Sequence, residues 1–416
     1  MHAHRFALGA VAVCSALVVA ACSSSGQSST AANGTSSSTG GSTTASSAIP
    51  IGIIGSYSGT QAASLGVVPN VAQAWASTVN AAGGLDGHSI KLYIKDDAGN
   101  PATAVTAAHE LVQEDKVVAI VGDGSNVDAA WAPYVQQAGV PVVGGYSLNP
   151  TMFTNPDFFP QGPNGIAANY GVVALAKTVG PKYGVLYCAE AAQCKQGSTL
   201  VAALAKALGV TLAINAPVSS TATDYTAICQ QVKASGVQSY SIFEAGGVAL
   251  RIAQQCSQQG VTARLISAPG AITASWGGIA AVNGTIGTEM TAPWFDSSTP
   301  ATAAYQAAMK KYVPDIGSQQ GGEASAQWVA GQLFDAAVKA SGTTTVTSAS
   351  VKKGLYALKA ETLGGLTQPL TYTAGKPTVL NCYFTMGIKN QQFVTVNGLA
   401  ASCAPATVID AILKAM

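Results

Sequence analysis

The stretch VVAIVGDGSNVDAAWAPYVQQAGVPVVGG, residues 117–145, decides the fold that we expect for this chain. It opens with a short apolar run at 117–122, continues as a helical pattern at 129–139 and ends in a second apolar run at 140–145. Short apolar runs bounded by glycine favour buried strands, and longer amphipathic stretches favour helices. A strand, a helix and a strand in this order predict two parallel strands with a crossover helix.

The same alternation extends in both directions along the chain. Asn100 and Pro101 are typical of a helix N-cap and its first position. The predicted strands are 49–55, 89–97, 117–122, 140–145, 182–188, 210–218, 237–245 and 263–270. The predicted helices are 68–82, 100–115, 129–139, 166–180, 197–209, 224–236, 246–260, 299–313 and 323–342, and a hairpin at 381–396 is expected to turn at Lys389-Asn390.

A loop rich in Pro, Gly and Asn near residues 155–165 interrupts the rhythm, which then restarts. The chain has 416 residues, more than one hydrophobic core usually organises. We therefore expect an α/β protein with two doubly wound parallel-sheet lobes.

The composition of the first 48 residues predicts a leader followed by a tether. One arginine precedes an apolar run at 7–21, which is shorter than the about 20 residues that a membrane span needs and indicates a signal peptide over residues 1–21. Val19-Ala20-Ala21-Cys22 resembles a bacterial lipobox, which implies lipid attachment at Cys22; an ordinary secretory cleavage site is the alternative. Residues 22–48 are rich in Ser, Thr, Gly and Ala, a composition typical of a disordered tether. We expect a body held by a lipid anchor on the extracytoplasmic face of the cell membrane.

The composition argues against several classes of function. Lys and Arg number 20 against 19 Asp and Glu, so no basic excess points to nucleic acid. Downstream of Cys22 the histidines are His88 and His109, and neither follows a predicted strand. The chain shows no nucleophile elbow, P-loop, complete dinucleotide fingerprint or metal-ligand spacing. We predict no enzyme activity, no metal and no cofactor.

Six cysteines follow Cys22, and six cysteines allow 15 pairings. An extracytoplasmic location favours disulfides over buried free thiols. The order of the cysteines suggests three bridges that are local in sequence: Cys188 to Cys194, Cys229 to Cys256, and Cys382 to Cys403.

Several stretches resemble the type I periplasmic solute-binding proteins, in the branch of the leucine/isoleucine/valine-binding protein. They are IGIIGSYSG, NAAGGLDGHSIKLYIKDDAGNPATAV, residues 117–145 and NPTMF. The resemblance implies two α/β lobes joined by three crossover strands, which close on a small solute. We expect one lobe at 49–162 and 291–372 and the other at 163–290 and 373–416.

The resemblance also implies a ligand site. In parallel sheets ligands bind outside the carboxyl ends of strands, and the loop at 122–126 offers a hydroxyl and backbone N–H groups near a helix start, where a ligand carboxylate would fit. Leu148 stands where amino-acid-binding members place a threonine, and Leu65 where they place an aromatic residue. Glu244 lies near the expected acidic anchor, although helix capping and solvated carboxylates remain alternatives for Ser125 and Glu244. The implied ligand-binding residues are Tyr57, Ser58, Leu65, Ser125, Asn126, Tyr146, Ser147, Leu148, Glu190, Gln193, Glu244, Trp276 and Glu323.

The sequence thus predicts a monomeric solute-binding lipoprotein of an ABC importer that passes its solute to permease subunits. The two apolar changes favour a small amide or carboxylic acid with an apolar part, or an amino-acid-like solute, over a plain branched-chain amino acid. The alternatives are a ligand-sensing module that signals to a membrane partner and an extracellular hydrolase, for which the chain offers no clear base.

Overall fold

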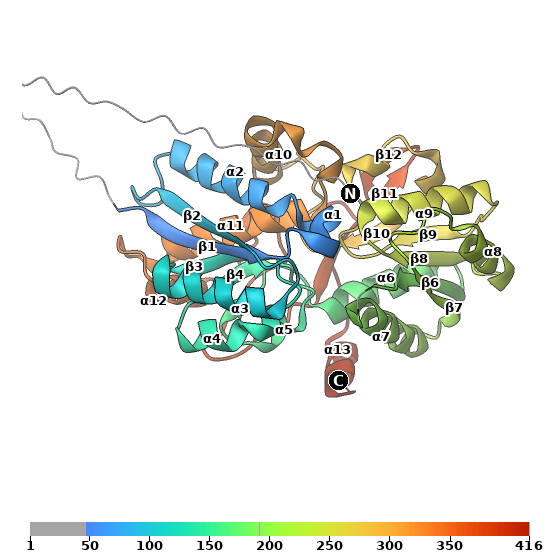
Figure 1. Cartoon of the computed structure of the whole chain (residues 1–416), viewed down its shortest axis with the longest axis horizontal. Coiled ribbons are helices and arrows are strands. Elements are labelled where there is room, and N and C mark those ends of the chain that lie inside the picture. The colour runs from blue at the N-terminus through green and yellow to red at the C-terminus, as the bar shows by residue number, and fades with distance from the viewer. Residues whose placement is uncertain (1–46, 191, 416) are drawn as a thin grey trace, which may run out of the picture. The chain divides into compact units, whose positions relative to one another are not determined.

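A computed structural model describes residues 47–190 and 192–415. The predicted signal peptide, Cys22 and most of the tether lie outside the described residues. Two sheets with their flanking helices organise the described part of the chain (Figure 1).

The first sheet is parallel throughout and has the order β2-β1-β3-β4-β5. Its strands are β1 (Ile49–Gly55), β2 (Ile90–Asp96), β3 (Ala119–Asp123), β4 (Val142–Gly145) and β5 (Phe158–Phe159). The helices that accompany it are α1 (Ala62–Leu65), α2 (Val68–Ala81), α3 (Pro101–His109), α4 (Ala132–Gln137), α5 (Pro150–Thr154), α10 (Pro300–Tyr312), α11 (Gly322–Ser341) and α12 (Ser348–Ala357).

Neighbouring residues on these strands face opposite cores, as expected of strands buried on both faces. Ile53 belongs to the apolar cluster that includes Trp75 of α2 and Phe334 of α11. Ile54 belongs to the cluster that includes Ala108 of α3 and Val135 of α4. Helices therefore cover both faces of the first sheet.

The second sheet has the order β12-β11-β10-β9-β8-β6-β7, with β13 also paired to β11. Its strands are β6 (Lys182–Cys188), β7 (Thr211–Val218), β8 (Ser239–Phe243), β9 (Arg264–Ser267), β10 (Ile286–Glu289), β11 (Cys382–Lys389), β12 (Gln392–Thr395) and β13 (Ser402–Cys403). Its helices are α6 (Gly165–Val179), α7 (Ala192–Leu208), α8 (Thr226–Ser235), α9 (Gly246–Gln258) and α13 (Ala406–Ala415). Strands β6 to β10 are parallel, whereas β11 runs antiparallel to β10, β12 and β13. The α/β class and the two lobes are thus confirmed.

The structure corrects several predicted boundaries. The helix expected at 100–115 is α3 followed by a π-helical turn at Glu110–Glu114, although Asn100 caps it as predicted, accepting from the N–H groups of Ala102 and Thr103. The helix expected at 129–139 is a 3₁₀ turn at Asp128–Ala130 and then α4. The hairpin turns at Asn390 and Gln391, one residue later than predicted, and both have positive φ.

The predicted elements omit β10, α12 and α13. Helices α12 and α13 have ten residues each, whereas β10 spans only four, IGTE. Such a run is too short for a periodicity to show.

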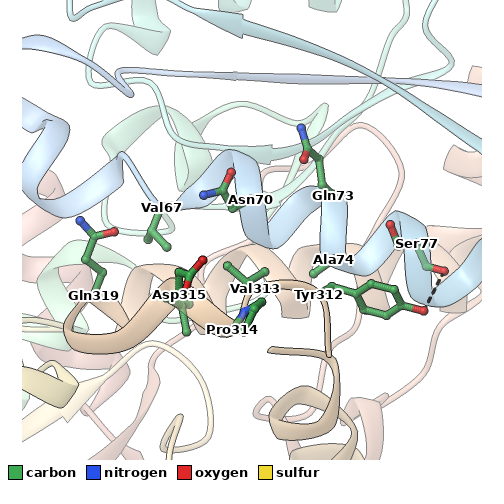
Figure 2. A pocket seen from close by; sticks show the side chains of 11 residues that line it. Val67, Asn70, Gln73, Ala74, Ser77, Tyr312, Val313, Pro314, Asp315 and Gln319 are labelled. Carbon is green, nitrogen blue, oxygen red and sulfur yellow. Dashed lines mark hydrogen bonds between the residues drawn. The ribbon is translucent and has the colours of Figure 1, made fainter. Parts of the chain in front are cut away.

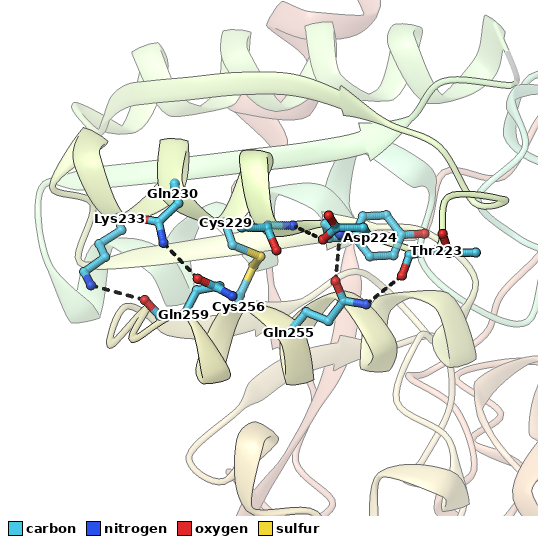
Figure 3. The surroundings of a disulfide bond; sticks show 10 residues. Thr223, Asp224, Cys229, Gln230, Lys233, Gln255, Cys256 and Gln259 are labelled. Atoms are coloured by element: carbon cyan, nitrogen blue, oxygen red, sulfur yellow. Dashed lines mark hydrogen bonds between the residues drawn. A yellow bond between two sulfur atoms is a disulfide. The ribbon is translucent and has the colours of Figure 1, made fainter.

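All three predicted disulfides are confirmed: Cys188–Cys194, Cys229–Cys256 and Cys382–Cys403. Cys229–Cys256 joins α8 to α9 (Figure 3). Cys382 and Cys403 are direct partners in the register of β11 and β13.

Candidate functional site

The carboxyl ends of β1, β3 and β4 meet at one edge of the first sheet. Gly55 pairs with Gly124, and Asp123 pairs with Gly145. The loops that leave these strands carry seven of the predicted site residues: Tyr57, Ser58, Ser125, Asn126, Tyr146, Ser147 and Leu148. The topology therefore brings them to a single edge, where parallel sheets bind ligands.

A buried hydrogen-bond network around Asp97 fixes two of these loops. The Asp97 carboxylate accepts hydrogen bonds from the hydroxyls of Ser56 and Ser125. Ser125 Oγ in turn accepts from the indole N–H of Trp131, at 3.3 Å, and from the N–H of Val127, at 3.2 Å. Ser125 is fully buried, so its hydroxyl is committed to the protein interior.

Tyr57 lies over the paired glycines Gly55 and Gly124. A Cβ on Gly55 would come within 2.6 Å of the Tyr57 ring, so a larger residue there would displace the ring. The Tyr57 hydroxyl is buried and has no hydrogen-bond partner. Burial, together with the nearby Asp123 carboxylate, raises the pKa of Tyr57 well above its usual value.

The loop after β4 presents Tyr146, Ser147 and Leu148. Ser147 is fully buried, yet its hydroxyl has no hydrogen-bond partner. Burial raises the pKa of Tyr146, and the carboxylate of Glu323 adds to the effect. Tyr146 and Glu323 are thus brought close together from β4 and α11.

Helix α11 packs closely against this edge because glycines in the sheet leave room for it. A Cβ on Gly122 would collide with the Gln327 side chain, and a Cβ on Gly144 would come within 2.5 Å of Ala330. Gln327 donates to the carbonyl of Val121 across the contact, at 3.3 Å. This close packing places Glu323, in the first turn of α11, near the loop after β4.

On the second sheet, Glu190 and Glu244 follow β6 and β8. The Glu190 carboxylate accepts from the Ser219 hydroxyl at 2.7 Å and the Ser220 N–H at 2.8 Å, and the Ser219 bond lowers its pKa. Burial raises the pKa of Glu244 to about 7, with a further contribution from Glu190. Glu244 Oε1 is buried without a hydrogen-bond partner.

Leu65, Gln193 and Trp276 complete the predicted set. Leu65 is buried in α1, which contacts both α9 and α11. Trp276 is fully buried and donates from its indole N–H to the carbonyl of Gly246 at 3.0 Å. The side chain of Gln193 lies outside the described part of the structure.

The prediction missed Glu289, the last residue of β10. It is 2% exposed, and Oε1 of its carboxyl group has no hydrogen-bond partner. Burial raises its pKa well above the usual range, and the carboxylate of Glu323 raises it further. The sequence carried no usable signal for it, because the four residues of β10, IGTE, are too few to show a strand pattern.

The two lobes contact each other next to these carboxyl groups. The Ala274 N–H, in the loop after β9, donates to the carbonyl of Gln320 at 2.8 Å. Thr273 and Gly321 form an isolated antiparallel bridge. The segment that leads into α11 is therefore held against the second sheet.

A separate hollow of about 350 Å³ lies between α2 and the chain after α10 (Figure 2). Asn70 and Gln73 of α2 and Asp315 and Gln319 of the chain after α10 are among the residues that line it (Figure 2). None of the predicted site residues lines this hollow, and it lies on helices, not at strand ends.

Within residues 47–190 and 192–415, no group of three or more His, Cys, Asp or Glu side chains is arranged to hold a metal ion. In the same ranges no helix combines the length and apolarity that a membrane crossing requires.

Known proteins share this architecture. The structure of a branched-chain amino acid ABC transporter protein from Thermus thermophilus with bound valine superposes with a TM-score of 0.74 at 15% identity, covering 88% of this chain and 98% of that one. A solute-binding protein from R. palustris in complex with benzoate gives 0.68 at 19% identity, covering 86% and 98%. At these identities the likeness shows the fold.

The sequence comparisons point the same way. An amino acid binding protein of Pseudomonas aeruginosa is 30% identical over 238 residues, which are 54% of this chain and 61% of that protein, less than two thirds of its length. Residues 48–392 match the family model described as periplasmic binding protein. Because this match runs from the start of β1 to β12, the chain belongs to the periplasmic binding protein family.

Proposed function

We propose that this chain is the extracytoplasmic solute-binding component of an ABC importer, which captures a small organic solute between its lobes and delivers it to a permease. Closure over the solute follows from differential affinity, because a solute that contacts both lobes stabilises the closed arrangement. The role is binding rather than catalysis.

The observation that carries this proposal is a set of buried polar atoms without partners, at strand ends of both lobes and at the start of α11. Ser147 Oγ and Glu323 Oε2 belong to the first lobe, and Glu244 Oε1 belongs to the second. Buried polar groups are almost always hydrogen-bonded, so each unsatisfied one calls for an explanation. A bound solute that donates and accepts at these atoms supplies it.

Two neighbours of the site are apolar. Leu148 lies in the loop after β4, and Leu65 is buried in α1 beside α9. We propose that the solute combines an apolar part with an amino-acid-like, amide or carboxylic acid group. We assign solute contact to Tyr146, Ser147, Leu148, Glu244 and Glu323, and a supporting role to Ser125, whose hydroxyl is engaged inside the loops.

We further propose that the protein is a monomer held at the membrane through lipid on Cys22, with lobe boundaries after residues 162, 290 and 372. Mass spectrometry of the cell-derived protein tests the anchor. We expect a chain that begins at a diacylated Cys22; an unmodified chain that begins elsewhere would contradict it.

A thermal-shift screen of the purified protein tests the binding role. The panel contains amino acids, amides, short-chain acids, aromatic acids, amines and polyols. A solute that binds the native state alone stabilises it by about 2.7 kcal/mol at a hundredfold excess over Kd. We expect saturable stabilisation by one chemical class.

The same screen is repeated with Tyr146→Ala, and with Gln73→Ala in the separate hollow as the matched control. Loss of the shift in Tyr146→Ala alone supports the site at the strand ends. A shift that Gln73→Ala removes and Tyr146→Ala leaves unchanged would move the site to the hollow between α2 and the chain after α10. A panel that stabilises nothing would argue against solute capture.

A further inference from the structure

A buried glutamate, Glu289, and a half-buried one, Glu323, meet where the lobes contact each other. Glu289 ends β10 of the second sheet, and Glu323 lies in the first turn of α11, which packs on β3 and β4 of the first sheet. Burial raises the pKa of Glu323 to about 8, and burial together with the Glu323 carboxylate raises the pKa of Glu289 well above its usual range. The pair therefore combines one acid from each lobe.

Two glycines let the carboxyl groups approach the backbone. A Cβ on Gly270, in the loop after β9, would lie 3.5 and 3.7 Å from the two carboxylate oxygens of Glu323. A Cβ on Gly322 would lie 2.7 Å from Glu289 Oε2 and 2.7 Å from the Cα of Gly270. Gly270 thus stands beside both acids; a Cβ at Gly322 would press on Glu289, whereas a Cβ at Gly270 would meet Glu323 at ordinary van der Waals distance.

The neighbourhood continues toward the loop after β4. A Cβ on Gly162 would lie 2.8 Å from the unpartnered Ser147 Oγ and 2.8 Å from the carbonyl oxygen of Met290, the residue after Glu289. Burial raises the pKa of Tyr146, and the carboxylate of Glu323 raises it further. Ser147, Tyr146 and the two acids therefore border one region of the site.

No positive charge of the described chain offsets this pair. The ion pairs within residues 47–190 and 192–415 join Lys95 to Glu110 and Asp115, and Lys352 to Asp157. Glu289 Oε1 and Glu323 Oε2 are both buried without a hydrogen-bond partner. Buried carboxylates without a cation or donors are strongly disfavoured.

We infer that the solute carries a positively charged group, an ammonium or amidinium, which binds between Glu289 and Glu323. This inference rests on the proposed function and names the charge of its solute. The cation contacts one carboxylate from each lobe, so its binding favours the closed arrangement. Without the cation, closure brings two acids together and requires that the pair retain a proton.

The test uses two sets of probes matched in shape. Benzoate, benzamide and benzamidine differ in charge on one aromatic frame, and 4-methylpentanoate, 4-methylpentanamide and 3-methylbutylamine do so on one aliphatic frame. Thermal shifts are measured at pH 8 and pH 5.5. We expect the cationic member of at least one set to stabilise the protein most, and more at pH 8 than at pH 5.5, because at pH 5.5 the Glu323 carboxyl group, whose pKa is about 8, holds a proton that the cation must displace.

Glu289→Gln and Glu323→Gln keep the shape of the side chains and remove the charge. We expect each to weaken binding of the cationic probe at least tenfold. Glu114→Gln, at an exposed position in the turn after α3, is the matched control and should bind as the wild type does. Each variant without probe should melt no lower than the wild type at pH 8, which also shows that it folds.

Calorimetry of the wild type at pH 7, in two buffers of different ionisation enthalpy, gives an independent measurement. A cation that binds the acid pair should release protons, because carboxyl groups that held a proton at pH 7 ionise when the cation contacts them. This readout needs no variant.

The outcomes separate the two proposals. Binding of cations that depends on both Glu289 and Glu323 and releases protons supports the inference. Binding by the neutral or anionic members alone overturns the inference and leaves solute capture standing, as does cation binding that both glutamine variants retain. Failure of every probe overturns the inference, and failure of the wider panel as well overturns the proposed function.

Discussion

Asp97 holds the loops at the edge of the first sheet in place, and Ser125 is one of its partners. The Ser125 hydroxyl donates to Asp97 and accepts from Trp131 and Val127, so no polar capacity is left over for a solute. Its contribution to binding is therefore indirect, through the shape of the loop.

Ser125→Ala separates these roles. We expect it to lower the free energy of unfolding by about 1–3 kcal/mol, because Asp97 and the Trp131 indole each lose a partner inside the protein. The affinity for a solute should change less than threefold. Urea denaturation and a binding titration check both values; a stable variant with a tenfold loss of affinity would return Ser125 to direct contact.

At the scale of elements, much of the architecture follows from the sequence. Buried strands such as β1 are uniformly apolar, and Asn100-Pro101 announces the start of α3. Helix α12 was not predicted because Gly354 interrupts its weak pattern of apolar residues. A Cβ on Gly354 would collide with the carbonyl of Ala337, so this glycine serves a helix contact that no local pattern reports.

That contact predicts an effect of Gly354→Ala that is opposite to the one expected from helix propensity. Alanine is a better helix former than glycine by roughly 1 kcal/mol. Gly354→Ala should nevertheless destabilise the protein by about 1–3 kcal/mol, because the methyl group overpacks the contact between α11 and α12. Denaturation of Gly354→Ala tests this, with Gly247→Ala, where a Cβ meets open space, as the control. Stabilisation by Gly354→Ala would show that the helices separate freely.

The disulfides stabilise the protein by joining its elements. Cys229 and Cys256 are 27 residues apart and join α8 to α9, where Gln255 also accepts from the Tyr225 N–H (Figure 3). Cys188 and Cys194 are only 6 residues apart. In the chain-entropy model a disulfide that closes a longer loop adds more to the free energy of unfolding. The model gives about 3.5 kcal/mol for Cys229–Cys256 and about 2 kcal/mol for Cys188–Cys194.

We therefore expect Cys229→Ala with Cys256→Ala to lose more stability than Cys188→Ala with Cys194→Ala. Urea denaturation of both double variants measures the difference. The reverse order would indicate that the Cys188–Cys194 bridge fixes native structure beyond closing a short loop.

At the scale of the whole molecule, several buried acids favour protonation. Burial raises the pKa of Asp335 to about 7 and that of Asp128 to about 6, besides Glu244 and Glu323. Such groups bind more protons in the folded state than in the unfolded state between their two pKa values. The free energy of unfolding should then fall as the pH rises from about 4.5 to about 8.

Melting temperatures measured from pH 4.5 to 8.5 test this slope. Asp335→Asn should flatten it, because the amide keeps an acceptor for the Trp75 indole N–H, which lies 3.3 Å from either Asp335 oxygen, and cannot ionise. A stability that rises with pH through this range would contradict the direction of these pKa shifts.

The candidate site was partly foreseeable. Residues after strands, such as Tyr146 and Glu244, could be placed at the edges because parallel strands end together. Glu289 could not, because β10 is too short to show a pattern and its meeting with Glu323 depends on how the two lobes come together. The sequence also could not show that the Ser125 hydroxyl is fully hydrogen-bonded inside the protein, because only the folded loops bring Asp97 and Trp131 close to it.

The most direct measurement is a calorimetric titration of the purified protein with the solute that stabilises it best in the screen, repeated with one variant from each lobe. We predict one solute per chain, and at least tenfold weaker binding in both Tyr146→Ala and Glu244→Gln. Full affinity in both variants, or a loss confined to one of them, would contradict capture of the solute between the lobes.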